Sequence, residues 1–566
     1  MGKRKLPILV FGLLLGGILF GATFSRAEVK TVKHSYKNIY TQKYQKEALS
    51  QLTKWKKTKR TISKPLLVKN PFGTMSTSIY FYGISDKPYY VNCTITASGS
   101  ETITRRLMNN GKNQLTTKHE YLITGLVAGK KNTVKLQFYD ENQDVKKVYK
   151  FSVKIKADKV ITKITKVKKG SSKAQVSQGF YAMFGHDKSK ATNIYYYDNK
   201  GANRGRTPLN GYRTDRILTV GNNWIFSYDL DKLAVMNRLG RIVKTITLKG
   251  YQLHHDFMYD DQHKKLLCLV NDKKKNTIED VVISVDLKTK KVKKLIDFAT
   301  LMSSARKKHV QREGGKNTYG GTELDWLHLN SLDLINDGEL IVSSREESSL
   351  IKVKNIYSKP KIDYIIHSGT FYNNTKLKKY LLKRVGKSFV GHAGQHTITV
   401  EKDSSLPEGQ YYLYMYNNNF GSAKTLPNFN WKKYKGVGGY WKGSASYYYK
   451  YLVDEKKDTY KLVQKFSVPY SSVVSGVQHY YGNITSNSGM NHSFGEYDSQ
   501  GKMIRTFKYK AKRYAYRVMK YDFDIFYYFP PKEDSSTTAM TPAATPTATP
   551  TPVATPTAAP TPVPAG

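Results

Sequence analysis

Short runs in which hydrophobic and polar residues alternate fill most of the chain, and they predict β-strands. In the first part of the chain such runs occur at 77–82, 90–95 and 133–138, and segments rich in Gly, Asn, Asp and Lys separate them. Strands at this spacing are typical of a small immunoglobulin-like β-sandwich. We therefore predict such a sandwich over residues 65–157.

A weak repeat follows between residues 175 and 530. A His, Asn or other polar residue precedes a small or acidic residue, an apolar residue, a turn and a second strand. The aligned copies are 255–259, 330–334, 396–400 and 475–479, with 215–219 as a further copy. Units of about 40 to 75 residues built from several strands are typical of propeller blades. The pattern predicts an all-β chain whose main domain, 175–530, is a six-bladed β-propeller that the strands around 513–528 close against the first blade.

One helix is expected before the sandwich. Tyr40, Tyr44, Ala48, Leu52 and Trp55 recur at spacings of three and four residues, which predicts an amphipathic helix. We interpret residues 28–64 as a basic helical stalk. Its lysine-rich face would lie on an anionic membrane surface, or its apolar face would pack on the next domain.

The two ends of the chain differ from the rest. Lys3, Arg4 and Lys5 precede an apolar run at 6–24, so residues 1–27 are expected to be an export signal or an uncleaved membrane anchor. The protein is then secreted or held at the extracytoplasmic cell surface. No other apolar run approaches this length, which argues against a multispanning transporter or channel. Residues 534–566 are rich in Ser, Thr, Ala and Pro and predict a disordered tail.

Composition adds a strong charge to this picture. The chain has 93 Lys and Arg against 43 Asp and Glu, a formal charge of +50, while 44 Tyr and 22 Phe supply core material. Such a field attracts anions. In an exported protein the expected partners are cell-wall polymers, anionic lipid, or sulfated or phosphorylated small molecules, and not nucleic acid. The charge could also serve solubility alone. Whether the protein forms a homodimer is open. Cys93 and Cys268 allow one disulfide at most, and their redox state is left open.

The repeat also predicts a polar cluster at the propeller axis. Inner strands converge there, and residues two apart point to the same side of a strand. The predicted cluster consists of His255 (or its neighbour His254), His328, Asn330, Arg345, His396 and Ser475.

Several short motifs in this region resemble one enzyme family. They are Trp326-Leu327-His328-Leu329-Asn330-Ser331, Ile341-Val342-Ser343-Ser344-Arg345, His254-His255-Asp256 and Gly394-Gln395-His396. They look like the motifs of bacterial arylsulfate sulfotransferases, in which a small β-sandwich precedes a six-bladed propeller.

The resemblance implies a function and roles for the residues. The enzyme would transfer a sulfuryl group from a phenolic sulfate donor to a phenol acceptor, with no cofactor and no metal. His396 would be the nucleophile that becomes transiently sulfated, and His255, His328, Asn330 and Arg345 would surround the sulfuryl group. His254 and Ser475 are expected to contact the substrate. Thr397 departs from the family pattern, in which an acidic residue follows the nucleophile, so the group that orients the His396 ring is open.

Two other interpretations remain at this point. In a metal-dependent propeller lyase or esterase, His255, His328 and His396 would bind a divalent ion. No Asp or Glu aligns with them to complete the set, and Arg345 would repel a cation. In a non-catalytic surface protein, the basic propeller would bind an anionic wall polymer or a glycan.

Overall fold

The computed structural model describes residues 23–24 and 28–529, apart from 34, 36, 110, 158–161, 186–191, 212–213, 318–319, 368–370, 435 and 524–525. The predicted tail at 534–566 and nearly all of the predicted export segment lie outside the described residues. Within these ranges, the helices are too short or too polar for any of them to cross a membrane.

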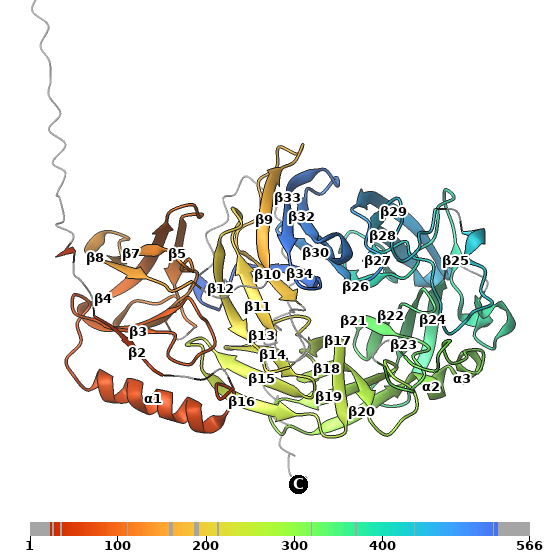
Figure 1. The fold of residues 1–566 in the computed structure, drawn as a ribbon, viewed down its shortest axis with the longest axis horizontal. Coiled ribbons are helices and arrows are strands. Elements are labelled where there is room, and N and C mark those ends of the chain that lie inside the picture. Colours follow the sequence, from red (N-terminus) through yellow and green to blue (C-terminus); the bar gives the residue numbers. More distant parts are fainter. Residues whose placement is uncertain are drawn as a thin grey trace, which may run out of the picture.

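Six sheets arranged in a ring make up most of the molecule (Figure 1). The strands of the first three blades are β10 (Phe180–Gly185), β11 (Asn193–Tyr197), β12 (Asn203–Pro208) and β34 (Ala515–Tyr521); β13 (Leu218–Val220), β14 (Asn223–Asp229), β15 (Lys232–Asn237) and β16 (Ile242–Thr247); and β17 (Tyr251–Asp260), β18 (Lys265–Asp272), β19 (Val281–Asp286) and β20 (Val292–Asp297). Those of the last three are β21 (Leu329–Asn336), β22 (Glu339–Ser344), β23 (Ser349–Lys354) and β24 (Lys361–His367); β25 (Lys383–Arg384), β26 (His396–Glu401), β27 (Gln410–Asn417), β28 (Ser446–Asp454) and β29 (Thr459–Val468); and β9 (Lys163–Lys169), β30 (Ser475–Tyr480), β31 (Asn483–Ser488), β32 (Ser493–Tyr497) and β33 (Met503–Lys510). The six-bladed β-propeller predicted from the repeat is confirmed.

The ring is closed by strands from both ends of the propeller sequence. Near the C-terminus, β34 pairs antiparallel with β10 as the innermost strand of the first blade. From the N-terminal side, β9 pairs antiparallel with β33 as the outermost strand of the last blade. Opening the ring would therefore break two ladders, and the predicted closure by residues around 513–528 is confirmed.

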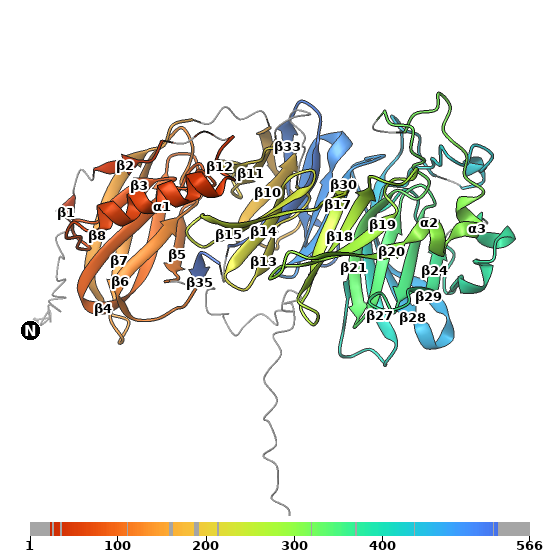
Figure 2. The ribbon, with the colours of Figure 1, turned by 90° about the horizontal axis from the view of Figure 1, so that it is seen from below.

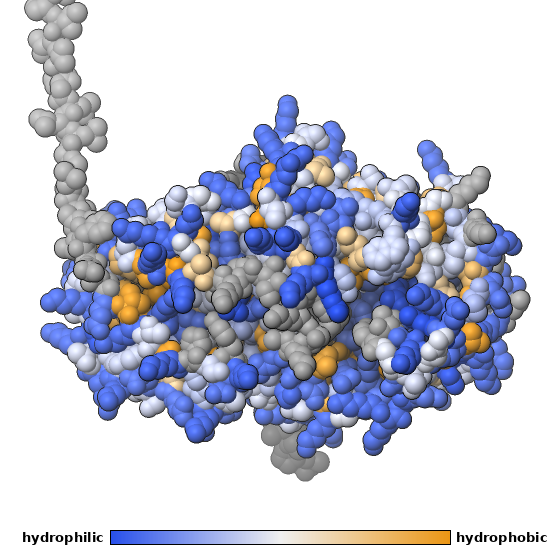
Figure 3. Space-filling view, viewed as in Figure 1, coloured by the Kyte–Doolittle hydropathy of each residue, from blue (hydrophilic) through white to orange (hydrophobic). Residues whose placement is uncertain are grey.

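The blades are held together by apolar layers at their interfaces. Residues of the third and fourth blades share one buried cluster that includes Leu267, Val282, Leu332 and Val342. Comparable clusters join the other neighbouring blades. The face shown in Figure 3 is mostly hydrophilic, which agrees with the high charge of the chain.

The N-terminal body is organised by one long strand, β4 (Ile79–Ala97). Its first half pairs with β3 (Leu66–Lys69) and β6 (Thr116–Ile123), and its second half pairs with β7 and β5. The remaining strands of this body are β1 (Thr23–Phe24), β2 (Val29–Thr31), β5 (Ile103–Leu107), β7 (Lys131–Tyr139), β8 (Val145–Lys154) and β35 (Tyr528–Phe529). The two halves give the two layers of a sandwich, whose core is continuous with that of the first two blades.

The expected amphipathic helix forms as α1 (Gln42–Lys56), which lies along β2 and β3 and reaches the second blade (Figure 2). Just before the helix, Tyr40 stacks on Tyr228 of β14 with ring centroids 4.0 Å apart. Inside it, Gln45 Oε1 accepts a hydrogen bond of 3.1 Å from the Ile242 amide. The apolar face of α1 thus packs on both bodies.

The remaining helices are short and lie in connections between strands. They are α2 (Phe298–Leu301), α3 (Ser303–Arg306) and the 3₁₀ turns η1 (Phe371–Asn374), η2 (Lys378–Tyr380), η3 (Trp431–Lys433), η4 (Glu455–Lys457) and η5 (Gly489–Asn491). Cys93 and Cys268 are buried and unpaired, in β4 and β18 respectively.

Candidate active site

In four blades, a residue in or directly before the innermost strand has a left-handed backbone conformation. These residues are His255 (φ 54°), His328 (φ 50°), Thr397 (φ 57°) and Val474 (φ 49°). Non-glycine residues rarely adopt this conformation, and it interrupts the alternation of side chains along a strand. Side chains next to these positions are therefore directed toward the axis in a way that strand periodicity does not predict.

This backbone feature changes the register inferred from the repeat. The repeat aligned His255 with Asn330, His396 and Ser475. In the structure, the left-handed residues that correspond to His255 are His328, Thr397 and Val474, which lie one or two residues from the aligned positions. The alignment assumed unbroken alternation, whereas the ladders are irregular at these points, for example between His396 and Thr399.

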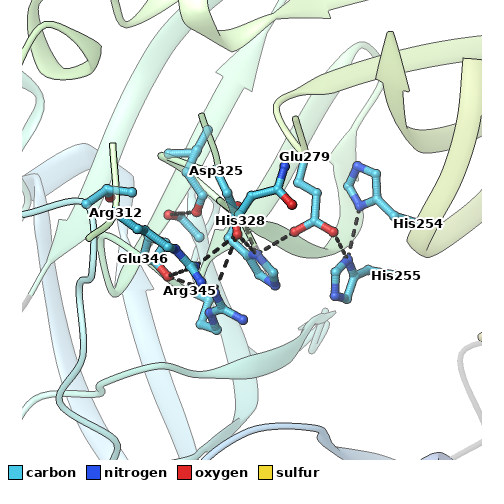
Figure 4. A network of polar contacts seen from close by, with 12 residues as sticks. His254, His255, Glu279, Arg312, Asp325, His328, Arg345 and Glu346 are labelled. Atoms are coloured by element: carbon cyan, nitrogen blue, oxygen red, sulfur yellow. Dashed lines mark hydrogen bonds and ion pairs between the residues drawn. The ribbon is translucent and has the colours of Figure 1, made fainter. Parts of the chain in front are cut away.

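Buried side chains from two blades form a continuous polar chain (Figure 4). His254 Nδ1 lies 3.1 Å from His255 Nδ1, which lies 3.3 Å from Glu279 Oε1. The other oxygen of Glu279 lies 2.5 Å from His328 Nδ1, which is also 2.9 Å from both oxygens of Asp325. The sequence left open whether His254 or His255 faces the site; it is His255 that contacts the carboxylate and packs against His328.

The surroundings of His328 favour its protonated form. Burial and the Arg345 guanidinium would lower the pKa of His328, but the carboxylates of Asp325 and Glu279 outweigh them and raise it above its ordinary value. Carboxylate oxygens only accept hydrogen bonds, so Nδ1 carries a proton, and in the imidazolium form Nε2 would carry the second one. In contrast, burial lowers the pKa of His254 to about 4, so that ring is neutral.

Arg345 places a second cation beside this chain. Its Nη2 donates to Glu346 Oε1 at 2.7 Å and lies 3.8 Å from Asp325 Oδ2. Its backbone amide donates to the His328 carbonyl at 3.1 Å. Arg345 thus pairs with Glu346, and 12% of the Arg345 side-chain surface is accessible.

His396, at the start of β26, is oriented by Asn418. Asn418 Oδ1 lies 2.7 Å from His396 Nδ1, and the Gly394 carbonyl lies 3.1 Å from the same nitrogen. The Asn418 amide nitrogen donates to the Ser471 carbonyl at 2.7 Å, which turns its oxygen toward His396. Both neighbours of Nδ1 are acceptors, so Nδ1 carries the proton and Nε2 keeps its lone pair.

The environment also keeps His396 neutral. Burial lowers the pKa of His396 to about 3; the hydrogen bond that His396 donates to Asn418 opposes this, while the positive charges of Arg345, His328 and Arg517 add to it. The ring of Tyr516, in β34, lies 6.3 Å from His396 and 5.5 Å from His255, which brings the three blades together.

Asn330 and Ser475 support the site through other residues. The Asn330 amide nitrogen donates to the Gln395 carbonyl at 2.6 Å and so holds the backbone next to His396. The Ser475 hydroxyl donates to the Val474 carbonyl and accepts from Asn418 at 3.3 Å. Both were predicted to lie around the substrate; the hydrogen bonds described here join them to other parts of the protein.

A buried ion pair connects the inner strands near these residues. Asp256 accepts two hydrogen bonds from Arg517, of 3.0 and 3.2 Å, and lies 2.9 Å from Arg216 Nε. Arg517 also donates to the Asn330 carbonyl at 3.1 Å. Asp256, Arg216, Arg517 and Asn330 come from four blade segments, so this group joins the inner strands across the ring.

Sequence reasoning missed Glu279, Asp325 and Asn418. Asp325 stands three residues before His328, and Asn418 lies in an Asn-Asn-Asn run directly after β27, so both had weak local signals. Glu279 had none, because it comes from the connection between β18 and β19.

No acidic residue aligns with the histidines in the repeat, but the structure brings two carboxylates, those of Glu279 and Asp325, beside them. Glu279 forms one group of potential ligands with His254 and His255, and another with Asp325 and His328, each with ligand atoms within 4.8 Å. His396 belongs to neither group among the described residues. The Arg345 guanidinium, 3.8 Å from Asp325, opposes a cation at the second group.

Solved structures similar to this chain are distant. A putative 6-phosphogluconolactonase from Bacteroides fragilis is 10% identical and covers 76% of this chain and 98% of its own, with a TM-score of 0.34. A structure of a nidogen/laminin complex is 9% identical over 60% of this chain and 97% of its own, with a TM-score of 0.33. A putative 6-phosphogluconolactonase from Bacteroides uniformis is 10% identical over 78% and 98%, with a TM-score of 0.32. Scores this low carry no information on function.

The family comparison is more informative. No curated protein matches the chain. The sequence profile of the family described as Arylsulfotransferase (ASST), however, matches residues 165–527, which is the whole propeller and well over half of the chain. This chain therefore belongs to the arylsulfotransferase family.

Proposed function

We propose that this protein transfers a sulfuryl group from a phenolic sulfate ester to a phenol through a sulfohistidine at His396. The observation that carries the proposal is the state of His396: neutral, with Nδ1 bound to Asn418 and Gly394, in the field of Arg345, His328 and Arg517. An anionic donor is drawn to those cations, and the lone pair of Nε2 is available to attack it.

The first half of the reaction forms the intermediate. His396 Nε2 bonds to sulfur while the bond between sulfur and the phenolic oxygen breaks, and its electron pair stays on the departing oxygen. His328 Nε2 gives its proton to that oxygen. Among the histidines of the site, His328 suits this task because Asp325 and Glu279 stabilise its charged form.

The second half reverses these steps with a new phenol. The acceptor hydroxyl gives its proton to His328, its oxygen bonds to sulfur, and the bond between sulfur and Nε2 breaks with its electron pair returning to His396. Sulfuryl transfer resembles phosphoryl transfer in having a loose transition state, with charge on the non-bridging oxygens. Arg345 is placed to stabilise that charge.

The test is an assay of the full chain with a nitrophenyl sulfate, with and without a phenol acceptor and with and without a chelator. Release of nitrophenol that depends on the acceptor, follows ping-pong kinetics and ignores chelator supports the proposal. Release into water alone would identify a sulfatase. Loss of release with chelator would favour a metal at the Glu279 groups, and no release with any acceptor would favour a binding protein.

Asn418 should be required for the orientation of the nucleophile. Asn418→Ala is expected to lower kcat/KM for the donor about 10²-fold, because misplacing a reacting group by about an ångström costs that much. Asn418→Asp keeps an acceptor oxygen and should recover most of the rate. Its negative charge should also raise the pKa of His396 and add an acid limb to the pH profile that the alanine variant lacks. Asn336→Ala, at the outer end of β21, is the matched control; a fall as large in that variant would contradict a specific role for Asn418.

The pH dependence should report on His328. Because the pKa of His328 is raised, its acid form persists as pH rises above about 6.5. We expect kcat/KM for the donor to be flat up to that raised pKa and then to fall about tenfold per pH unit. Glu279→Gln removes one stabilising negative charge, so the fall should begin at a lower pH; measuring both enzymes from about pH 5 to about pH 9 decides this. An unchanged pH of decline would rule out Glu279 as the group that holds the proton on His328.

We also propose that the protein acts outside the cytoplasm. The support is the sequence of residues 1–27, with Lys3, Arg4 and Lys5 before an apolar run. Fractionation of producing cells, with and without residues 1–27, tests it; retention of both forms in the cytoplasm would contradict the proposal.

A further inference from the structure

The turn that orients His396 also holds a long loop. After β27 ends at Asn417, Asn418 contacts the nucleophile, and Asn419 and Phe420 lead into the connection that returns to β28 at Ser446. Asn419 Nδ2 donates to the carbonyls of Gly436 and Ala445, at 2.7 and 3.0 Å. One side chain thus fixes the far part of the loop to the turn at the active site.

Further hydrogen bonds hold this loop, which contains the short helix η3, in place. The Gly438 amide donates to the Asn419 carbonyl at 2.8 Å, and the Gly421 amide donates to the Gly438 carbonyl at 3.1 Å. The Tyr470 hydroxyl donates to the Gly439 carbonyl at 2.5 Å. These hydrogen bonds fix the backbone directly before Tyr440 and Trp441.

Three aromatic side chains extend outward from the nucleophile. Phe420 lies against the His396 turn: its amide donates to the Ala393 carbonyl at 3.1 Å, and a Cβ at Gly394 would come within 3.0 Å of its carbonyl oxygen. The ring of Tyr440 meets Phe420 edge to face at 6.0 Å, and Trp441 meets Tyr440 at 4.7 Å. We call Phe420, Tyr440 and Trp441 the aromatic rim.

The rim lies beside the charged site. Burial raises the pKa of Tyr440, Tyr514 adds to this and the Arg345 guanidinium opposes it, so the Tyr440 hydroxyl is within electrostatic reach of groups from two other blades. Exposure increases along the rim: Phe420 is buried, Tyr440 is 44% exposed and Trp441 is 80% exposed. An aromatic side chain buries about 150–250 Å² when covered, so Trp441 leaves a large stacking surface open.

We infer that the aromatic rim binds the aryl part of the phenolic substrates and favours those with two or more rings. A single ring placed for reaction at His396 reaches Phe420 and Tyr440, whereas a second ring continues outward to Trp441. Arg345 at the inner end meets the sulfate, and the rim meets the apolar end of the same molecule. This inference rests on the proposed function and extends it to the substrate class.

The experiment compares phenol with 2-naphthol as acceptors, using one nitrophenyl sulfate donor. Trp441→Ala should raise KM for 2-naphthol about three- to tenfold, as expected for the loss of one aromatic pair, and raise KM for phenol by less than about twofold. Trp441→Phe should recover part of the loss. Tyr481→Ala, 41% exposed at the far end of β30 and about 20 Å from Ser475, is the control and should change neither value.

A change in KM that is equal for the two acceptors, or no change, would overturn the inference. Binding of 2-naphthyl sulfate separates this failure from that of the proposed function. One outcome is that the wild type shows no transfer, while 2-naphthyl sulfate quenches its fluorescence and quenches Trp441→Phe less. That result would support binding by the aromatic rim and contradict the proposed transfer. If transfer occurs without any contribution from Trp441 to binding, only the rim is wrong.

Discussion

Replacing His396 with alanine is expected to lower sulfuryl transfer by at least about 10⁴-fold, because removal of a covalent nucleophile abolishes the two-step route. No other described histidine combines a lowered pKa, a fixed Nδ1 proton and a position among Arg345, His328 and Arg517. The measurement is acceptor-dependent nitrophenol release, together with capture of the intermediate. Wild type given a radiolabelled sulfate ester without acceptor should become labelled, and phenol should release the label.

The matched control is His263→Ala. His263 is 35% exposed in the turn between β17 and β18, where it stacks on Tyr357 and pairs with Asp260. Its loss should leave transfer and labelling unchanged. Labelling that persists in His396→Ala would assign the intermediate to another residue, and transfer without any labelled enzyme would point to direct transfer between substrates.

Replacing Asp256 with alanine is expected to cost about 3–5 kcal/mol of folding free energy, because it leaves a buried cation without its partner. Both oxygens of Asp256 are engaged by Arg517, whose side chain is 1% exposed, and Arg216 shares the same carboxylate. The measurement is the midpoint of thermal or denaturant unfolding. Because multidomain proteins commonly depart from two-state unfolding, the comparison uses the transition midpoints and not one global free energy.

A surface ion pair serves as the control for this loss of stability. Asp229→Ala breaks the pair with Lys232, whose side chains are 30% and 36% exposed, and should cost no more than about 1 kcal/mol. A double change, Asp256→Ala with Arg517→Met, removes the stranded charge and should recover part of the loss. Equal midpoints for Asp256→Ala and Asp229→Ala would show that the axial pair contributes little to the ring.

Much of the site was visible in the sequence because its motifs are local. His328, Asn330 and Arg345 stand within one blade, and His254 and His255 are neighbours, so short segments carry them. Their roles were less visible. Asn330 binds the Gln395 carbonyl, and the left-handed residues re-aim side chains that simple alternation had placed.

The sequence by itself determined the all-β class, the six blades and one amphipathic helix along Tyr40, Tyr44, Ala48, Leu52 and Trp55, since alternation, repeat and helical spacing are properties of neighbouring residues. Only the tertiary structure brought Glu279 to His328, Asn418 to His396 and Arg517 to Asp256. Glu279 lies 49 residues before His328, and Arg517 lies 261 residues after Asp256. Contacts at such separations exist because ring closure brings the inner strands to one axis, and no local pattern encodes which side chains meet there.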